Sequence, residues 1–229
     1  MKEKIYLIPG LMTDFRLWSR LTPYLNEYEL ITLEIPKSDD FDEIIKLIDQ
    51  KITCDKINLL GFSLGGYIAT YYSLKNPHRV NKLFLLSSTP SNTEQKDIPR
   101  RQEKLNLARK SSFIPLNEKK ALELLEIKDD KELLEITCAM FNDLGKEHFI
   151  TQLSSTLKRV DLLDQLLKLQ IPVRFYYSIN DRLLNFPWLE RLKKINHNFT
   201  LKHREGTSHN ISLEFPKELS LQIKEWMQE

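Results

Sequence analysis

The sequence predicts an α/β protein with a doubly wound, mainly parallel six-stranded sheet and a helical lid. Three observations support this fold class. Short, almost uniformly apolar segments alternate with amphipathic ones, as expected for parallel strands that helices cover on both faces. One long, charged and helical interval interrupts this alternation. A serine flanked by glycines stands where a predicted strand turns into a predicted helix.

Composition narrows the class further. The chain has 229 residues, 41% of them hydrophobic, which suffices for one domain of this kind. Basic and acidic residues nearly balance, at 34 against 32, so neither nucleic acid nor a membrane is expected as a partner. The spacing of Cys and His residues predicts no metal site, and Cys54 and Cys138 are expected to be free thiols. We expect a cytoplasmic monomer or homodimer that acts on a small-molecule substrate.

Six strands are predicted, each from a short apolar run. They cover residues 4–8, 30–35, 56–60, 80–87, 173–178 and 199–203. Five helices are predicted from apolar residues at helical spacing. They cover residues 15–25, 41–52, 64–76, 188–195 and 213–227.

The interval between the fourth and fifth strands is too long for a simple connection. Residues 89–168 are expected to form the helical lid, with Asn117 and Asp129 as N-caps of its helices. Residues 1–88 and 169–229 are expected to form the core beneath it.

A sharp turn is predicted at Gly61–Gly65, with Ser63 at its centre. The chain must reverse so tightly there that a Cβ atom at Gly61 or Gly65 would clash. Glycine is scarce in this chain, at 6 residues, yet it recurs at this turn and at Gly10, after the first strand. The pattern predicts Ser63 as a nucleophile, and a chance match in an ordinary strand–helix turn is the alternative.

A serine nucleophile needs a base, and His209 is the best placed of the histidines. The five histidines are His78, His148, His197, His203 and His209. Only His209 clearly follows the last predicted strand, at the sheet edge where functional groups of parallel α/β proteins gather. A solvent-facing loop histidine is the alternative interpretation.

Asp181 is the predicted acid that orients this base. It follows the fifth predicted strand, so it shares the carboxyl edge of the sheet with the serine and the histidine. Asp161 and Asp164 precede that strand and fit less well, and a simple Asn-Asp turn is the alternative for Asp181.

An oxyanion hole is predicted from two backbone N–H groups, those of Leu11 and Leu64. Leu64 begins the helix after Ser63, and Leu11 follows Gly10, which lets the backbone approach closely. A plain Pro-Gly turn at residues 9–10 is the alternative.

Together these features resemble the α/β-hydrolase superfamily over the predicted core, roughly residues 4–88 and 171–229. The resemblance implies ester or thioester hydrolysis through an acyl-enzyme, with no cofactor. Haloalkane dehalogenases and epoxide hydrolases resemble this fold but carry aspartate at the position of the serine in this turn, so Ser63 argues against both. Many relatives have His-Gly where this chain has Pro9-Gly10, which removes a side chain beside the predicted hole.

Three functions remain open at this point. The first is hydrolysis of a small carboxylic ester or thioester by Ser63. The second uses the same triad for carbon–carbon bond chemistry, as in the lyases of this superfamily in menaquinone synthesis. The third is a ligand-binding protein with little activity.

The lid is expected to line an apolar substrate pocket. Its candidate lining residues are Met12, Met140, Phe141, Phe149 and Leu153. Ordinary helix packing is the stronger interpretation for those within the lid.

The first part of the lid is also basic. Its cations are Arg100, Arg101, Lys104, Arg109 and Lys110. They could receive an anionic group such as a coenzyme A phosphate, but interleaved acidic residues favour a solvated helix face.

Overall fold

A computed structural model describes residues 2–110, 113–195 and 199–229. One six-stranded sheet organises the chain, and all its neighbouring strands pair in parallel, in the order β2-β1-β3-β4-β5-β6. The strands are β1 (Glu3–Ile8), β2 (Tyr28–Thr32), β3 (Ile57–Phe62), β4 (Val80–Leu86), β5 (Val173–Ser178) and β6 (Thr200–Arg204). The predicted fold class is therefore confirmed, and the sheet is wholly rather than mainly parallel.

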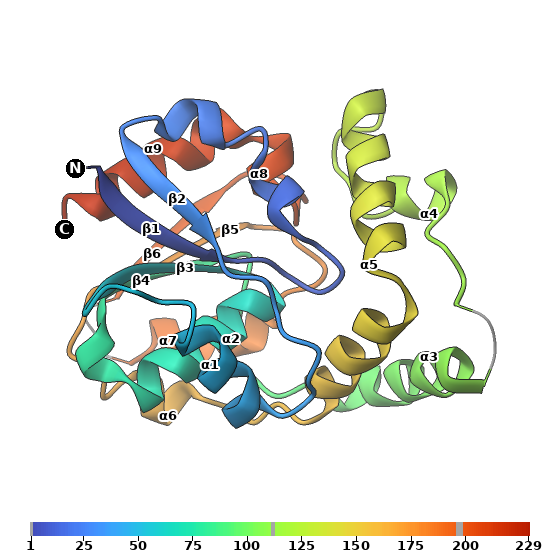
Figure 1. Cartoon of the computed structure of the whole chain (residues 1–229), viewed down its shortest axis with the longest axis horizontal. Helices are drawn as coiled ribbons and strands as arrows, with labels where there is room; N and C mark the ends of the chain where they lie inside the picture. The colour runs from blue at the N-terminus through green and yellow to red at the C-terminus, as the bar shows by residue number, and fades with distance from the viewer. Residues whose placement is uncertain (1, 111–112, 196–198) are drawn as a thin grey trace.

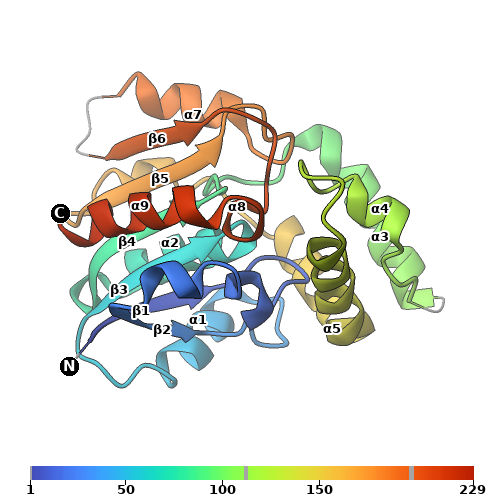
Figure 2. The same cartoon turned by 90° about the horizontal axis from the view of Figure 1, so that it is seen from above.

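Helices cover both faces of the sheet (Figure 1, Figure 2). The helices after successive strands are α1 (Phe41–Asp49), α2 (Leu64–Lys75), α6 (Leu163–Leu166), α7 (Phe186–Lys193), α8 (Ile211–Glu214) and α9 (Pro216–Met227). Side chains alternate along β1, so that Ile5 and Leu7 pack toward Trp226 while Tyr6 and Ile8 pack into the opposite cluster. Both clusters consist of fully buried side chains, each of which contributes about 1.5–3 kcal/mol to stability.

One predicted helix was wrong. Residues 15–25 form two short 3₁₀ helices, Phe15–Trp18 and Thr22–Leu25, instead of one α-helix. Proline at position 23 begins the second of them and cannot continue a hydrogen-bonded helix from the first. The apolar spacing still holds, because Leu17, Trp18 and Leu21 are all buried.

Three helices lie beyond the carboxyl ends of the strands (Figure 1). They are α3 (Ile98–Lys110), α4 (Glu118–Leu122) and α5 (Lys131–Leu157), and they fall within the interval predicted as a lid. Asn117 caps α4 as predicted, but the N-cap of α5 is Asp130, not Asp129. Only Asp130 is placed to accept the N–H of Leu133, three residues into the helix. The lid role of this interval stays a prediction.

The longest helix, α5, is broken at Gly145. Its φ of 71° is a left-handed conformation that glycine adopts without a steric penalty. The break separates two halves with different neighbours. Leu133 and Met140 of the first half join the core cluster around Trp18, whereas Gln152 of the second half reaches the loop after β1.

Candidate active site

Ser63 lies between β3 and α2 with φ of 52°, a conformation that a non-glycine residue rarely adopts. Such strain at the first position of a strand–helix turn lifts the side chain away from the sheet. A Cβ atom on Gly61 would stand 2.3 Å from the carbonyl oxygen of Gly65, so the predicted close approach across the turn is present. Ser63 is half-buried, and its hydroxyl has no hydrogen-bond partner among the described residues.

The loop after β1 packs against this turn. A Cβ atom on Gly65 would stand 2.2 Å from the carbonyl oxygens of both Ile8 and Pro9. A Cβ atom on Gly10 would stand 3.1 Å from the Cβ of Ser63. Glycine at positions 10 and 65 therefore lets the backbone of this loop lie directly beside the serine.

Two backbone N–H groups near Ser63 are unpaired. In the part of the chain that the structure describes, neither the N–H of Leu11 nor that of Leu64 has a hydrogen-bond acceptor. The N–H of Met12 is instead bound by the Oε1 atom of Gln152 at 2.7 Å. Buried N–H groups normally find an acceptor, so the two unpaired donors are consistent with the predicted oxyanion hole.

The predicted acid and base lie together. The Nδ1 atom of His209 is 2.6 Å from the Oδ2 atom of Asp181, whose side chain is 1% exposed. The ring centroid of His209 lies 5.0 Å from that of Phe62, the residue before Ser63. Because a carboxylate only accepts hydrogen bonds, Nδ1 carries the proton and Nε2 is left free to accept one.

The other predicted candidates lie elsewhere. His78 lies in the middle of a short 3₁₀ helix, His203 is exposed on β6, and the Nδ1 atom of His148 contacts the carbonyl of Leu144 within α5. His197 lies outside the described residues. Asp161 binds the indole of Trp188 at 2.8 Å and is not a partner of His209.

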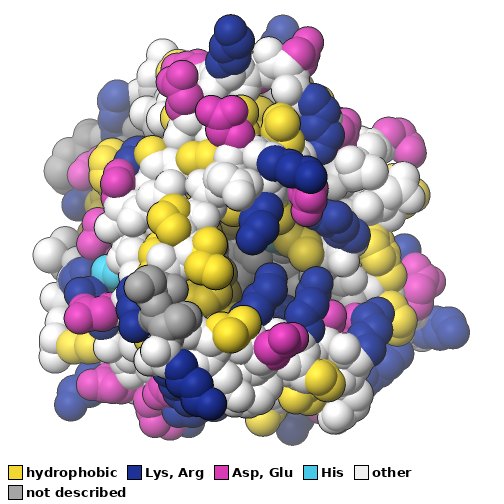
Figure 3. Space-filling view, turned by 90° about the vertical axis from the view of Figure 1, so that its right-hand side faces the viewer, with side chains coloured by type: hydrophobic (Ala, Val, Ile, Leu, Met, Phe, Trp, Pro, Cys, Tyr) yellow, Lys and Arg dark blue, Asp and Glu magenta, His cyan; other side chains and the backbone are white. Residues whose placement is uncertain are grey.

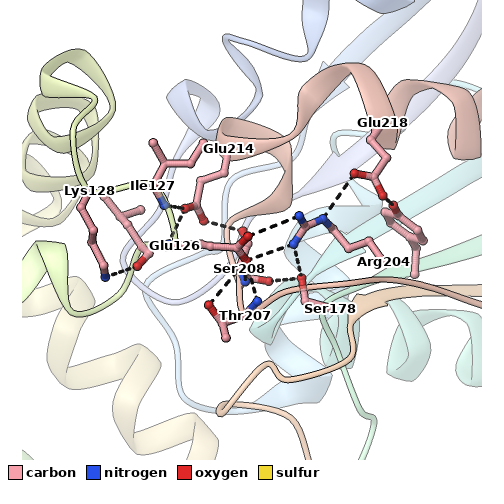
Figure 4. A network of polar contacts seen from close by, with 11 residues as sticks. Glu126, Ile127, Lys128, Ser178, Arg204, Thr207, Ser208, Glu214 and Glu218 are labelled. Atoms are coloured by element: carbon pink, nitrogen blue, oxygen red, sulfur yellow. Dashed lines mark hydrogen bonds and ion pairs between the residues drawn. The ribbon is translucent and has the colours of Figure 1, made fainter.

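A carboxylate from the chain between α4 and α5 holds the loop before His209 (Figure 4). Glu126 accepts the N–H groups of Thr207 and Ser208 at 2.5 and 2.7 Å, and Arg204 pairs with it at 3.1 Å. Burial raises the pKa of Glu126, but the hydrogen bonds from Arg204 and the two N–H groups outweigh it, so the pKa lies below its usual value. Gly206 permits this approach, since a Cβ atom there would stand 2.5 Å from the carboxylate.

Glu214 of α8 also links the chain around Glu126 to the loop before His209 (Figure 4). Its Oε1 atom accepts the N–H groups of Glu126 and Ile127 at 2.5 and 2.9 Å, and its Oε2 atom binds the hydroxyl of Ser208. Ser178, at the end of β5, donates its hydroxyl to the carbonyl of Ser208 at 2.6 Å. The backbone next to His209 is thus held on both sides by charged or buried groups.

Four of the predicted pocket residues have surroundings in the structure that bear on their role. Met140 packs into the core cluster around Trp18, which fits helix packing. Phe141 and Phe149 form an aromatic group with Phe113, with ring centroids 5.4 to 5.8 Å apart. Met12 is buried beside the serine turn with φ of 56°. Their part in substrate binding stays a prediction.

Sequence reasoning missed two residues that support this site, Gln152 and Glu126. Each acts across the chain, 140 residues from Met12 in one case and 82 from Ser208 in the other. Neither stands in a motif, and only the fold brings them to their partners. Among the described residues, no group of three or more His, Cys, Asp or Glu side chains could hold a metal ion.

Comparison with known proteins identifies the class. Residues 4–112 match the family model of the alpha/beta hydrolase fold. The structure of a thermophilic esterase from Thermogutta terrifontis superimposes with a TM-score of 0.82 at 17% identity, covering 100% of this chain and 90% of that one. The sheet, the serine turn and these matches show an α/β-hydrolase fold. In sequence, residues 4–112 resemble this family, and the whole chain shares its fold.

Similarity to curated relatives is lower and partial. Monoacylglycerol lipase ABHD6 of Bos taurus is 22% identical, over 94% of this chain and 72% of its own length. A 2-hydroxy-6-oxononadienedioate/2-hydroxy-6-oxononatrienedioate hydrolase of Pseudomonas putida is 29% identical, and the chain spans half of its length. These relatives support the hydrolase class. No helix in the described ranges is both long and apolar enough to cross a membrane.

Proposed function

We propose that this protein is a serine hydrolase that cleaves a small carboxylic ester or thioester. The observation that carries the proposal is the pairing of Asp181 with His209 at 2.6 Å, beside a serine held at φ of 52°. An acid–base pair and a serine nucleophile at one sheet edge are what acyl transfer requires. The esterase and lipase names among the similar proteins agree with it.

In the proposed reaction, the Oγ atom of Ser63 attacks the substrate carbonyl and its proton passes to Nε2 of His209. Asp181 keeps the proton on Nδ1 and stabilises the imidazolium. The N–H groups of Leu11 and Leu64 bind the oxyanion. His209 then returns the proton to the leaving alcohol or thiol, and the acyl group remains on Ser63.

A second half-reaction regenerates the enzyme. Water attacks the acyl-enzyme while His209 accepts its proton, and collapse of the second tetrahedral intermediate releases the acid and restores the Ser63 hydroxyl. A long or absent contact between Ser63 and His209 before substrate binds is common in such sites, because the bond tightens only in the Michaelis complex.

A fluorophosphonate probe tests the nucleophile, and a panel of p-nitrophenyl esters of rising acyl length tests the reaction. The wild-type protein should be labelled on Ser63 and turn over short esters, whereas Ser63→Ala should escape labelling and lose about a millionfold in kcat. Retention of most activity by purified Ser63→Ala would overturn the assignment. Labelling of Ser63 without turnover of any ester would overturn ester hydrolysis while leaving the nucleophile in place.

A further inference from the structure

Two arginines of the 89–168 interval lie near each other, and one of them contacts the helix that follows Ser63. The Cζ atom of Arg159, just after α5, is 4.8 Å from the ring centroid of Tyr67. Tyr67 is in the first turn of α2, where its N–H donates to the carbonyl of Ser63 at 3.3 Å. Its hydroxyl accepts the N–H of Val160 at 3.0 Å, which fixes the backbone next to Arg159. The second guanidinium, that of Arg101 in α3, is close enough for its charge to act on Arg159.

Neither guanidinium has an anionic partner among the described residues. The Nε atoms of Arg101 and Arg159 are buried without an acceptor, and within the described residues neither side chain forms a hydrogen bond or an ion pair. The neighbouring Arg100 is exposed and bound to Asp97 at 3.1 Å. Arg101 is half-buried whereas Arg100 beside it is exposed, so Arg101 is not fully part of the solvated face that the interleaved charges of α3 predict.

The protein neutralises guanidinium groups that are buried more deeply than these two. Arg174, with a side chain 1% exposed, is paired with Glu225 and Glu229. Arg204, at 8%, is paired with Glu126 and Glu218. Arg101 and Arg159 are half-buried, and even a partly buried charge without an anionic partner is costly, so a bound anion would explain them.

Each of the two arginines lies near another positive charge. Burial, with a contribution from Arg101, lowers the pKa of Arg159 to about 9. Burial likewise lowers the pKa of Arg101, and Asp97 offsets this only in part. The pKa of Lys104 is lowered by burial and then by the positive charges of Arg100, Lys120 and Arg101. On this face of the molecule, Lys and Arg side chains gather around a hollow (Figure 3).

We propose that Arg101 and Arg159, with Lys104 beside them, bind a carboxylate or phosphate group carried by the substrate. The planar guanidinium matches two oxygens of such a group, which would supply the missing acceptors. The inference rests on the proposed function and deepens it, because it makes the substrate an anionic ester or thioester. Tyr67 follows Ser63 by about one helical turn, so the proposed anion site and the proposed nucleophile lie against the same end of α2.

Matched monomethyl and dimethyl esters of succinate, glutarate and adipate test this directly, because each pair differs only in the charge at the far end. The release of acid can be followed by titration at constant pH. Wild-type protein should prefer the monomethyl ester of at least one length roughly ten- to hundredfold in kcat/KM. The preference should fall about tenfold or more in Arg159→Met and in Arg101→Met. The control, Arg109→Met, changes an exposed residue of the same helix and should keep it.

Binding measurements separate this inference from the reaction itself. Calorimetry on Ser63→Ala protein should detect monomethyl glutarate or glycerol 3-phosphate, which distinguish a carboxylate from a phosphate ligand, but not dimethyl glutarate. Arg159→Met in that background should abolish the heat of binding. Absence of binding to either anion, or a wild-type protein without preference for charged esters, would overturn the proposal. Failure of the proposed hydrolysis alone would leave the calorimetric result standing.

Discussion

The carboxylate of Glu126 accepts the backbone N–H of Ser208 at 2.7 Å, one residue before His209. A residue between α4 and α5 thereby holds the loop that presents the proposed base. Because the bond is charge-assisted and partly buried, it stabilises the conformation of this loop by about 1.5–3 kcal/mol.

Glu126→Gln should lower kcat about tenfold with little change in KM, because the loop around His209 loses its charged acceptor. The control is Glu205→Gln, which changes an exposed residue in the loop that Glu126 holds. A drop in Tm without any change in kcat would show that Glu126 is structural only.

The same substitution makes a pH prediction. The folded-state pKa of Glu126 lies below its ordinary value of 4.5, so its carboxylate stabilises the fold above that value. This contribution disappears as the pH falls through the folded pKa, because the group then takes up a proton in both states. The Tm difference between wild type and Glu126→Gln should be constant near pH 6 and shrink below about pH 4.5. A difference that grows in acid would contradict the sign.

Asp181→Asn should lower kcat by about four orders of magnitude while the protein stays folded. The amide removes the charge that stabilises the imidazolium and favours the wrong tautomer of His209. The turn itself should survive, because Oδ1 of the same side chain can still accept the N–H of Leu183, now at 3.0 Å. Circular dichroism alongside ester turnover checks both, and full activity with normal folding would remove Asp181 from the mechanism.

Gln152→Met should weaken the proposed oxyanion hole indirectly, through the loop that carries Leu11. The N–H of Met12 would lose its buried acceptor, which costs about 1–3 kcal/mol, and the loop that carries Leu11 would lose a fixed point. We expect kcat to fall about tenfold, and Gln102→Met, an exposed change in α3, to have no effect. An unchanged kcat in Gln152→Met would mean that packing alone holds this loop.

Gly65→Ala should be among the most damaging single changes. Its Cβ atom would stand 2.2 Å from two carbonyl oxygens that belong to the backbone, so we expect a loss of about 3 kcal/mol and a Tm lower by roughly 10 °C. Gly145→Ala is the comparison, since nothing lies within 4 Å of its Cβ position and only the left-handed φ opposes it, for about 1 kcal/mol. Equal Tm losses in the two variants would contradict this order.

Much of the fold could be predicted because its signals are local. Each strand is a short apolar run, and the spacing of Leu17, Trp18 and Leu21 marks a buried helical face even where the helix type was wrong. The serine turn is predictable for a related reason, since its glycines answer steric demands within a few residues of Ser63. The roles of Asp181 and His209 could be predicted because parallel strands end at one edge of the sheet, which places the loops after them together.

The sequence by itself determined the α/β class, the serine turn and the chain order of the proposed triad. Only the tertiary structure decided which distant side chains support that site and which charges remain unpaired. Arg100 and Arg101 are adjacent in sequence, yet Arg100 pairs with Asp97, whereas Arg101 is half-buried and its Nε atom has no acceptor. The physical reason is that pairing and burial depend on contacts between residues far apart in the chain, for which periodicity and spacing carry no signal.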